Sequence, residues 1–224
     1  MSQITLTVSD GHTFGAYEKK PDGTPRGGLV VVQEIFGVNP HIRDVADGYA
    51  AEGYHVIAPA LFDRAERDVE LGYDGPDRDK GIALRQKITI EQMLLDIAAC
   101  QQALAGSGKV GLVGYCLGGS LAWFTACRLP GFAATVGYYG GMIAKALDET
   151  PKCPVMLHFG EEDGGIPMSD VAKVQAAVNP ATAQVFAYAG AGHAFNRAGN
   201  HAWHGPSAET ALKRTLDFLR QNVG

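Results

Sequence analysis

The hydrophobic residues of this chain fall into two alternating patterns: short apolar runs, and longer segments with apolar residues every three or four positions. The apolar runs are rich in β-branched residues, which is typical of strands buried on both faces of a parallel sheet. They occupy residues 29–32, 55–58, 110–113, 134–138, 155–159 and 184–188. The segments with helical periodicity occupy residues 42–51, 90–105, 117–129, 169–178 and 207–221.

This alternation predicts a mostly parallel sheet with helices on both faces, because parallel strands need crossover connections. At the start of the chain, residues 4–8 alternate apolar and polar positions, and residues 13–18 follow the turn signal Asp10-Gly11. They predict a hairpin that forms an antiparallel N-terminal edge. The fold class expected is therefore α/β, and the length of 224 residues suits a single domain over residues 1–224.

One stretch, residues 61–81, fits neither period. It holds many charges, three glycines and one proline. We interpret it as a surface excursion that could lie over the site.

Composition and charge exclude several classes of function. Hydrophobic residues make up 46% of the chain and charged residues 19%, which is typical of a packed globular protein. The net charge of −5 and the lack of clustered Lys and Arg argue against a nucleic acid or an anionic membrane as partner. No basic leader and no apolar run of 18 residues is found, so we expect a cytoplasmic protein. The four cysteines contain no C-x-x-C pair, which favours free thiols in a reducing compartment.

The strongest chemical motif follows the strand at 110–113 and precedes a helix; it reads Gly114-Tyr115-Cys116-Leu117-Gly118-Gly119. This is the nucleophile-elbow pattern, with Cys116 in the place of serine. Gly114 and Gly118 would let the strand and helix approach closely. The positive end of the helix dipole would favour a thiolate at Cys116. The alternative, a small buried hydrophobic residue, we keep for Cys100, Cys127 and Cys153.

In an elbow hydrolase the acid and the histidine follow the nucleophile in that order, each on a loop after a strand. Asp163 lies after the strand at 155–159, and His193 lies after the strand at 184–188. His193 would take the thiol proton or pair with the thiolate, and Asp163 would fix its tautomer. Glu161 and Glu162 compete as the acid, but Asp163 has the better register between Gly160 and Pro167.

The oxyanion hole should use the backbone N–H of Leu117 and a second N–H from the loop at 33–39, where Ile35 is the expected donor. Glu34 is a carboxylate at an otherwise apolar strand end. It could be a local hydrogen-bonding group, but we favour a role in the site. His201 and His204 lie downstream of His193, but no cysteine or carboxylate spacing completes a zinc site, so we expect no metal.

Four motifs together make the chain resemble the dienelactone hydrolase (carboxymethylenebutenolidase) family over nearly its whole length. They are Gln33-Glu34-Ile35-Phe36-Gly37-Val38-Asn39, the Cys116 turn, Gly137-Tyr138-Tyr139-Gly140 and Gly192-His193-Ala194-Phe195. The resemblance implies a cytoplasmic, cofactor-free α/β-hydrolase with the triad Cys116, His193 and Asp163. It implies that the enzyme opens carboxymethylenebutenolides to maleylacetate in chloroaromatic catabolism. It also implies that the carboxylate matching Glu34 pairs with the resting thiol and helps to ionise it when substrate binds.

The family's substrate carries a free carboxylate held by arginines, and the matching positions here are Arg197 and Arg78. Arginine suits bidentate binding of a carboxylate. For Arg78 a solvated surface side chain is an equal alternative. Where the family has aromatic Tyr and Trp in the pocket, this chain has Ile82 and Arg85.

The expected partner is therefore a small ester or lactone, bound by a monomer or small homo-oligomer. Two alternatives stay open, a related carboxylesterase or lactonase with another small substrate, and a non-catalytic homologue that binds a ligand.

Overall fold

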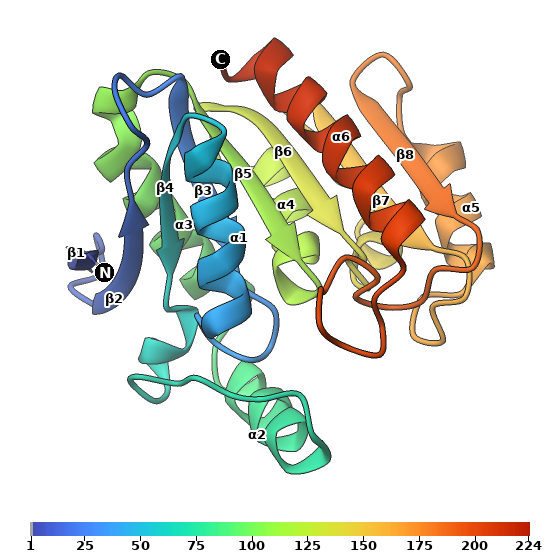
Figure 1. The fold of residues 1–224 in the computed structure, drawn as a ribbon, viewed down its shortest axis with the longest axis horizontal. Coiled ribbons are helices and arrows are strands. Elements are labelled where there is room, and N and C mark those ends of the chain that lie inside the picture. The colour runs from blue at the N-terminus through green and yellow to red at the C-terminus, as the bar shows by residue number, and fades with distance from the viewer. Residues whose placement is uncertain (1) are drawn as a thin grey trace. The chain divides into compact units, whose positions relative to one another are not determined.

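The computed structural model describes residues 2–224 and divides into two compact units (Figure 1). The first unit runs to Leu112 and includes residues 223–224, and the second spans Val113–Asn222. The strands are β1 (Ser2–Thr7), β2 (Thr13–Lys19), β3 (Gly27–Val32), β4 (Tyr54–Pro59), β5 (Val110–Tyr115), β6 (Phe132–Tyr138), β7 (Val155–Gly160) and β8 (Ala183–Tyr188). The helices are α1 (Pro40–Ala51), α2 (Gly75–Gln86), α3 (Ile90–Leu104), α4 (Leu117–Arg128), α5 (Met168–Ala177) and α6 (Gly205–Asn222), with short 3-10 helices at Leu61–Arg64, Ala105–Ser107 and Ile143–Lys145.

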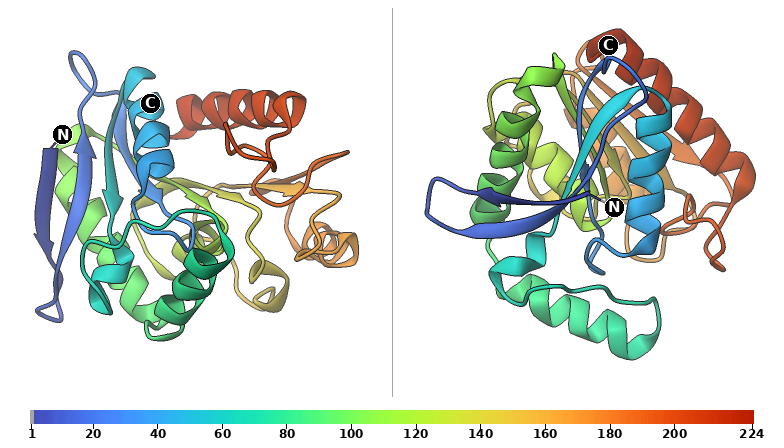
Figure 2. Two further views of the ribbon diagram at one scale, coloured as in Figure 1. Left: turned by 60° about the horizontal axis from the view of Figure 1, so that its bottom comes forward. Right: turned by 60° about the vertical axis from the view of Figure 1, so that its left-hand side comes forward.

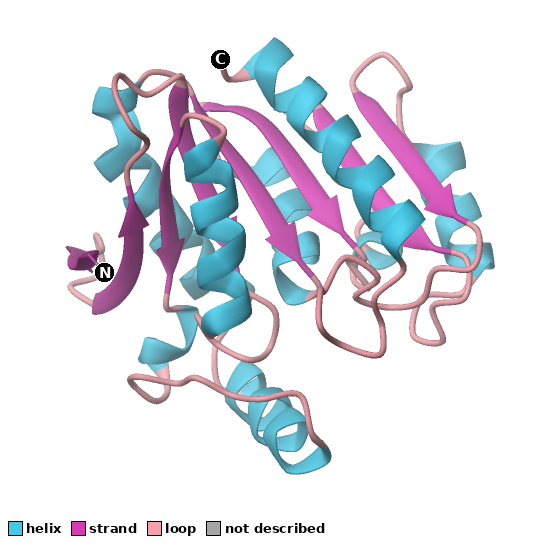
Figure 3. Cartoon of the chain, in the orientation of Figure 1, coloured by secondary structure: helices cyan, strands magenta, loops and turns pink. Residues whose placement is uncertain are grey.

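In the first unit, the strand order is β1-β2-β4-β3. β1 and β2 form the predicted antiparallel hairpin, with Leu6 opposite Phe14. β2 pairs antiparallel with β4, whereas β4 and β3 pair in parallel, so the antiparallel N-terminal edge is confirmed. Every residue of β3 and β4 is buried, which explains why their sequences are continuous apolar runs. The helices α1 and α3 cover opposite faces of these strands (Figure 3).

In the second unit, the strand order is β5-β6-β7-β8. β6 pairs in parallel with β7, and β7 with β8. Helix α6 packs on β6 and β7 from one face, while α4 and α5 lie on the other (Figure 2). α4 is buried along nearly its whole length, which accounts for its apolar sequence on all sides. The carboxyl ends of these strands carry the loops with Cys116, Asp163 and His193.

Residues 61–81, interpreted as a surface excursion with neither period, are mostly exposed or partly exposed, but they are not without regular structure, because they include the 3-10 helix Leu61–Arg64 and most of α2. Asp74 caps this helix by accepting a hydrogen bond from the Asp77 N–H at 3.0 Å, and Pro76 lies in its first turn. Only Gly81 and Leu84 of α2 are buried, so the helix has too few apolar residues to show a period. Within the first unit, α2 lies beyond the carboxyl end of β4 (Figure 1).

Arg64 anchors the segment after β4 to helix α3. Its guanidinium donates three hydrogen bonds of 2.8–3.1 Å to the Asp96 carboxylate, and a fourth of 2.9 Å to Asp10. The side chain of Asp96 is fully buried and that of Arg64 is 6% exposed. A buried carboxylate depends on such a partner, because an isolated charge in the interior is costly.

Replacing Arg64 with Met should therefore lower the free energy of unfolding by about 3–5 kcal/mol, measured by urea denaturation at pH 8. Burial raises the pKa of Asp96 to about 6, although Arg64 lowers it, so loss of Arg64 should raise this pKa further. The loss of stability should consequently shrink at pH 5, where the carboxyl is protonated. Arg67, 55% exposed in the same segment, is the matched control, and its change to Met should cost less than about 1 kcal/mol. Equal losses for the two variants would contradict the assignment.

Candidate active site

Cys116 lies at the sharp turn between β5 and α4, and its backbone is strained. Its φ is +54° and its ψ is −105°, a conformation that non-glycine residues rarely adopt. The Cys116 N–H donates to the Tyr138 carbonyl at 3.0 Å, and its own carbonyl accepts from the Ser120 N–H at 3.1 Å. The side chain is partly exposed, so the turn presents the thiol rather than packing it into the core.

Glycines let the strand and the helix meet at this turn. A Cβ on Gly114 would lie 2.0 Å from the Gly118 carbonyl oxygen, so no larger residue fits there. A Cβ on Gly119 would lie 2.1 Å from the Tyr138 carbonyl oxygen. The sequence pattern indicates Gly114 and Gly118 but not the need for Gly119, because that contact joins helix α4 to the end of β6, which lies further along the chain.

The other three cysteines lie in surroundings that disfavour a thiolate. Burial raises the pKa of Cys127 to about 12 and that of Cys153 to about 11. Burial also raises the pKa of Cys100, which is fully enclosed. Cys100 and Cys127 are buried, in keeping with the interpretation as small hydrophobic residues, whereas Cys153 is only partly buried.

The acid loop after β7 brings Asp163, and neither neighbouring glutamate, to the histidine. The Asp163 carboxylate is 4% exposed; its Oδ1 accepts from the Gly165 N–H at 2.8 Å, and its Oδ2 lies 2.6 Å from His193 Nδ1. Glu161 and Glu162 point to solvent. The backbone fixes this arrangement, because the Glu162 N–H donates to the Ala191 carbonyl at 2.9 Å and so joins the acid loop to the histidine loop.

His193 lies between Asp163 and Cys116. Burial works to lower its pKa, but hydrogen bonds with Asp163 and with Cys116 outweigh burial and raise the pKa to about 10. Since Nδ1 is engaged by Asp163, Nε2 is the atom left for the thiol. This arrangement of thiol, imidazole and carboxylate can hold an ion pair, accept a proton from the thiol and return it to a leaving group.

The remaining predicted site residues are distributed over both units. Leu117 is buried at the first position of α4, and Arg197 is buried with its N–H donating to the Ala194 carbonyl at 2.9 Å. Glu34, buried, and Ile35 follow β3 in the first unit, where a Cβ on Gly81 of α2 would lie 2.0 Å from the Ile35 carbonyl oxygen. The roles given to these residues stay predictions.

Arg78 is exposed on α2, in the first unit. Its assignment to a substrate carboxylate also stays a prediction, and the surface alternative stays beside it.

His204 has a structural partner, since its Nδ1 lies 2.8 Å from the Ser207 hydroxyl at the start of α6. His201 is exposed. Across residues 2–224, no group of three or more His, Cys, Asp or Glu side chains is placed to hold a metal ion. Over the same residues, no helix has both the length and the apolar surface needed to cross a membrane.

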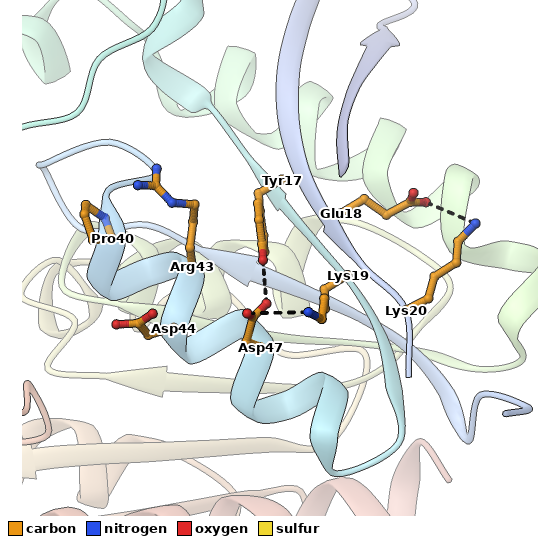
Figure 4. Close-up of a pocket in the computed structure, with 8 residues that line it drawn as sticks. All are labelled: Tyr17, Glu18, Lys19, Lys20, Pro40, Arg43, Asp44 and Asp47. Carbon is orange, nitrogen blue, oxygen red and sulfur yellow. Dashed lines mark hydrogen bonds and ion pairs between the residues drawn. The ribbon is translucent and has the colours of Figure 1, made fainter. Parts of the chain in front are cut away.

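A cavity of about 500 Å³ lies in the first unit, between β2 and α1 (Figure 4). Several of its charged groups are already paired: Asp47 accepts from the Tyr17 hydroxyl at 2.5 Å and lies 3.6 Å from Lys19, and Arg43 lies 2.7 Å from Glu70. It contains no cysteine, serine or histidine that could act as a nucleophile or base. We assign it no part in the chemistry.

Two residues at the site were missed from the sequence, Tyr139 and Asn196. The Tyr139 ring centroid lies 4.8 Å from that of His193, and its hydroxyl donates to Asn196 Oδ1 at 2.5 Å. The signal in the sequence is the motif Gly137-Tyr138-Tyr139-Gly140, which spans the carboxyl end of the buried strand β6, on the same sheet edge as the loops with Asp163 and His193.

Comparison with known proteins decides the family. The model of the dienelactone hydrolase family matches residues 14–223. The chain belongs to the dienelactone hydrolase family. Carboxymethylenebutenolidases of Pseudomonas putida and of Pseudomonas knackmussii are each 35% identical to it over 226 residues, covering 96% of this chain and 94% of the relative.

A solved structure agrees with this membership. The structure of a candidate dienelactone hydrolase from Klebsiella pneumoniae matches this chain with a TM-score of 0.83 and 30% sequence identity. The match covers 99% of this chain and 100% of the Klebsiella chain. The predicted α/β-hydrolase fold is therefore confirmed. Family membership also makes the protein an enzyme, a carboxylic ester hydrolase, and sets aside the non-catalytic alternative.

The contact between Asp163 and His193 has a measurable consequence. Replacing Asp163 with Asn removes a hydrogen bond and a negative charge that both raise the pKa of His193. In NMR titrations of the imidazole, His193 should then titrate well below the value of about 10 expected for the wild type. Glu162→Gln, at the exposed neighbour, is the control and should leave the titration unchanged. A midpoint that Asp163→Asn does not lower would contradict the assignment.

Proposed function

We propose that the enzyme hydrolyses a small carboxylate-bearing enol lactone, dienelactone, to maleylacetate, through a Cys116–His193–Asp163 triad and a thioester intermediate. The observation that carries this proposal is the chain of contacts from the strained Cys116 turn to His193 and on to Asp163. The relatives named carboxymethylenebutenolidase, matched over nearly the whole chain, support the choice of substrate.

The proposed reaction begins when the Cys116 sulfur attacks the lactone carbonyl carbon, while His193 holds the thiol proton. The N–H of Leu117, at the start of α4, is a donor for the oxyanion, and the predicted second donor is Ile35. The tetrahedral intermediate collapses with cleavage of the ring C–O bond, and the enol oxygen takes the proton from His193. Water then attacks the thioester as His193 removes its proton, and the Cys116 thiolate leaves.

The raised pKa of the His193 imidazole suits the proton transfers of this reaction. With its pKa raised to about 10, His193 is predominantly protonated at neutral pH and can stand beside a Cys116 thiolate as an ion pair. The buried Asp163 carboxylate stabilises that positive charge without leaving its hydrogen bond to the Gly165 N–H. This ion pair is the reactive form of the nucleophile. The resemblance implies that Glu34 pairs with the resting thiol, so the ion pair would form when substrate binds.

The alternative is a related carboxylesterase or lactonase that acts on another small ester. It is favoured by Ile82 and Arg85, which stand on α2 where the resemblance implies an aromatic Tyr and Trp. A panel of dienelactones beside neutral esters of similar size separates the two. A preference of at least about tenfold in kcat/KM for the carboxylate-bearing lactones supports the main proposal, and a preference for neutral esters supports the alternative.

Replacing Cys116 with Ala should lower kcat on dienelactone by at least about 1,000-fold, because the nucleophile and its partners act as a unit. The measurement is steady-state turnover followed by the loss of dienelactone absorbance. Cys153→Ala is the matched control and should retain full activity. Dienelactone turnover that survives in Cys116→Ala would refute the covalent mechanism.

Replacing Arg197 with Met tests recognition of the substrate carboxylate. Hydrogen bonds to a charged group contribute about 1.5–3 kcal/mol, so kcat/KM for dienelactone should fall about 10- to 100-fold. For a neutral ester such as p-nitrophenyl acetate it should change less than about threefold. Arg220→Met, at an exposed arginine of α6, should alter neither substrate. Equal losses on both substrates would assign Arg197 to the packing of the loop instead.

A further inference from the structure

Tyr139 stands directly behind the catalytic imidazole in strained backbone. Its φ is +39°, and its N–H donates to the His158 carbonyl at 2.7 Å, which holds the residue at the end of β6. Its ring is fully buried and packs against two rings of the histidine loop, with centroid distances of 4.8 Å to His193 and 5.8 Å to Phe195. Non-glycine residues keep such a conformation only where the surroundings fix it, and such sites cluster around function.

The Tyr139 hydroxyl reaches past the imidazole to the turn that follows it. It donates to Asn196 Oδ1, three residues after His193. In that turn Ala194 has a φ of +61°, and the Arg197 N–H donates to the Ala194 carbonyl at 2.9 Å. The turn therefore carries His193 at its start and Arg197 at its end. The side chain of Asn196 links it to the end of β6 through the hydrogen bond with Tyr139.

A second contact joins this end of β6 to the nucleophile. The residue before Tyr139 is Tyr138, whose carbonyl accepts the Cys116 N–H at 3.0 Å. One dipeptide thus holds the nucleophile turn through a backbone bond and the histidine turn through a side-chain bond. Because thiol and imidazole must stay within hydrogen-bond distance, small shifts between the two turns cost rate.

We propose that Tyr139 and Asn196 are positioning residues of this enzyme, whose hydrogen bond sets the place of the His193 imidazole relative to the Cys116 thiol. The inference rests on the proposed triad and deepens it. Neither side chain takes or gives a proton in the reaction. The bond restrains the turn at 193–197, and the ring limits rotation of the imidazole, so that Nε2 stays directed at the sulfur.

The variants Tyr139→Phe and Asn196→Ala remove the bond from either side, and Tyr139→Phe keeps the ring against His193. Each should lower kcat on p-nitrophenyl acetate about 10-fold with KM within about twofold, because the reacting groups and not substrate binding are disturbed. The double variant should lose no more than either single one, since both remove the same bond. Asn196→Asp keeps an acceptor for the hydroxyl and should restore most of kcat.

The second readout needs no turnover. In NMR titrations of Tyr139→Phe and Asn196→Ala, the pKa of His193 should fall from about 10, because a looser turn weakens the bonds to Asp163 and Cys116 that raise it. Tyr188→Phe is the matched control. It removes a buried hydroxyl that lies 2.8 Å from His158 and accepts from Arg214, and it should lower stability while leaving kcat and the His193 titration unchanged.

The outcomes separate this inference from the proposed function. If Cys116→Ala retains turnover, the proposed function fails, whereas the titration still reports on the positioning of His193. Should Cys116→Ala be inactive while Tyr139→Phe and Asn196→Ala keep wild-type kcat and titration, the triad stands and the positioning role is overturned. Losses that multiply in the double variant, or that Asn196→Asp does not restore, would also overturn it.

Discussion

The candidate active site depends on a close approach of the backbone at the Cys116 turn. The positive φ of Cys116 is unfavourable for a residue with a side chain, and it persists because the chain on both sides is held. A Cβ at Gly114 or Gly119 would meet a carbonyl oxygen at about 2 Å, so the strand, the helix and the end of β6 meet only where glycine stands. This contact places the thiol at the first turn of α4, beside the exposed N–H groups of the helix.

The remaining chemistry follows from loops that leave parallel strands at the same edge. The acid loop follows β7 and the histidine loop follows β8, and the backbone bond from Glu162 to Ala191 joins them. Asp163 is thereby buried with one oxygen on a backbone N–H and the other on His193. The hydrogen bonds of His193 with Asp163 and Cys116 stabilise the protonated imidazole more than burial destabilises it, so the pKa of His193 rises. The raised pKa of His193 thus comes from the loops that the fold brings together, and the proposed ion pair with Cys116 would depend on them.

Much of this arrangement could be predicted from the sequence, because buried parallel strands and amphipathic helices have distinct periods. The strand that ends before Cys116, and the order of Cys116, Asp163 and His193, are visible in the pattern. Helix α2 escaped, because a mostly exposed helix has few apolar positions and is marked only by its Asp74 cap. Tyr139 and Asn196 also escaped, since their contact spans 57 residues and the motif that contains Tyr139 does not by itself indicate a chemical role.

The central claim is that Cys116 becomes covalently bound to the substrate, and the most direct test is mass spectrometry of enzyme quenched with acid during turnover. Opening of a lactone leaves both parts of the substrate on the sulfur, so the tryptic peptide of residues 110–128 should gain the full mass of the lactone. Fragmentation should locate the addition on Cys116 and not on Cys127, the second cysteine of that peptide. Unmodified Cys116 throughout turnover by the Asp163→Asn variant, in which deacylation should be slow, would contradict the account.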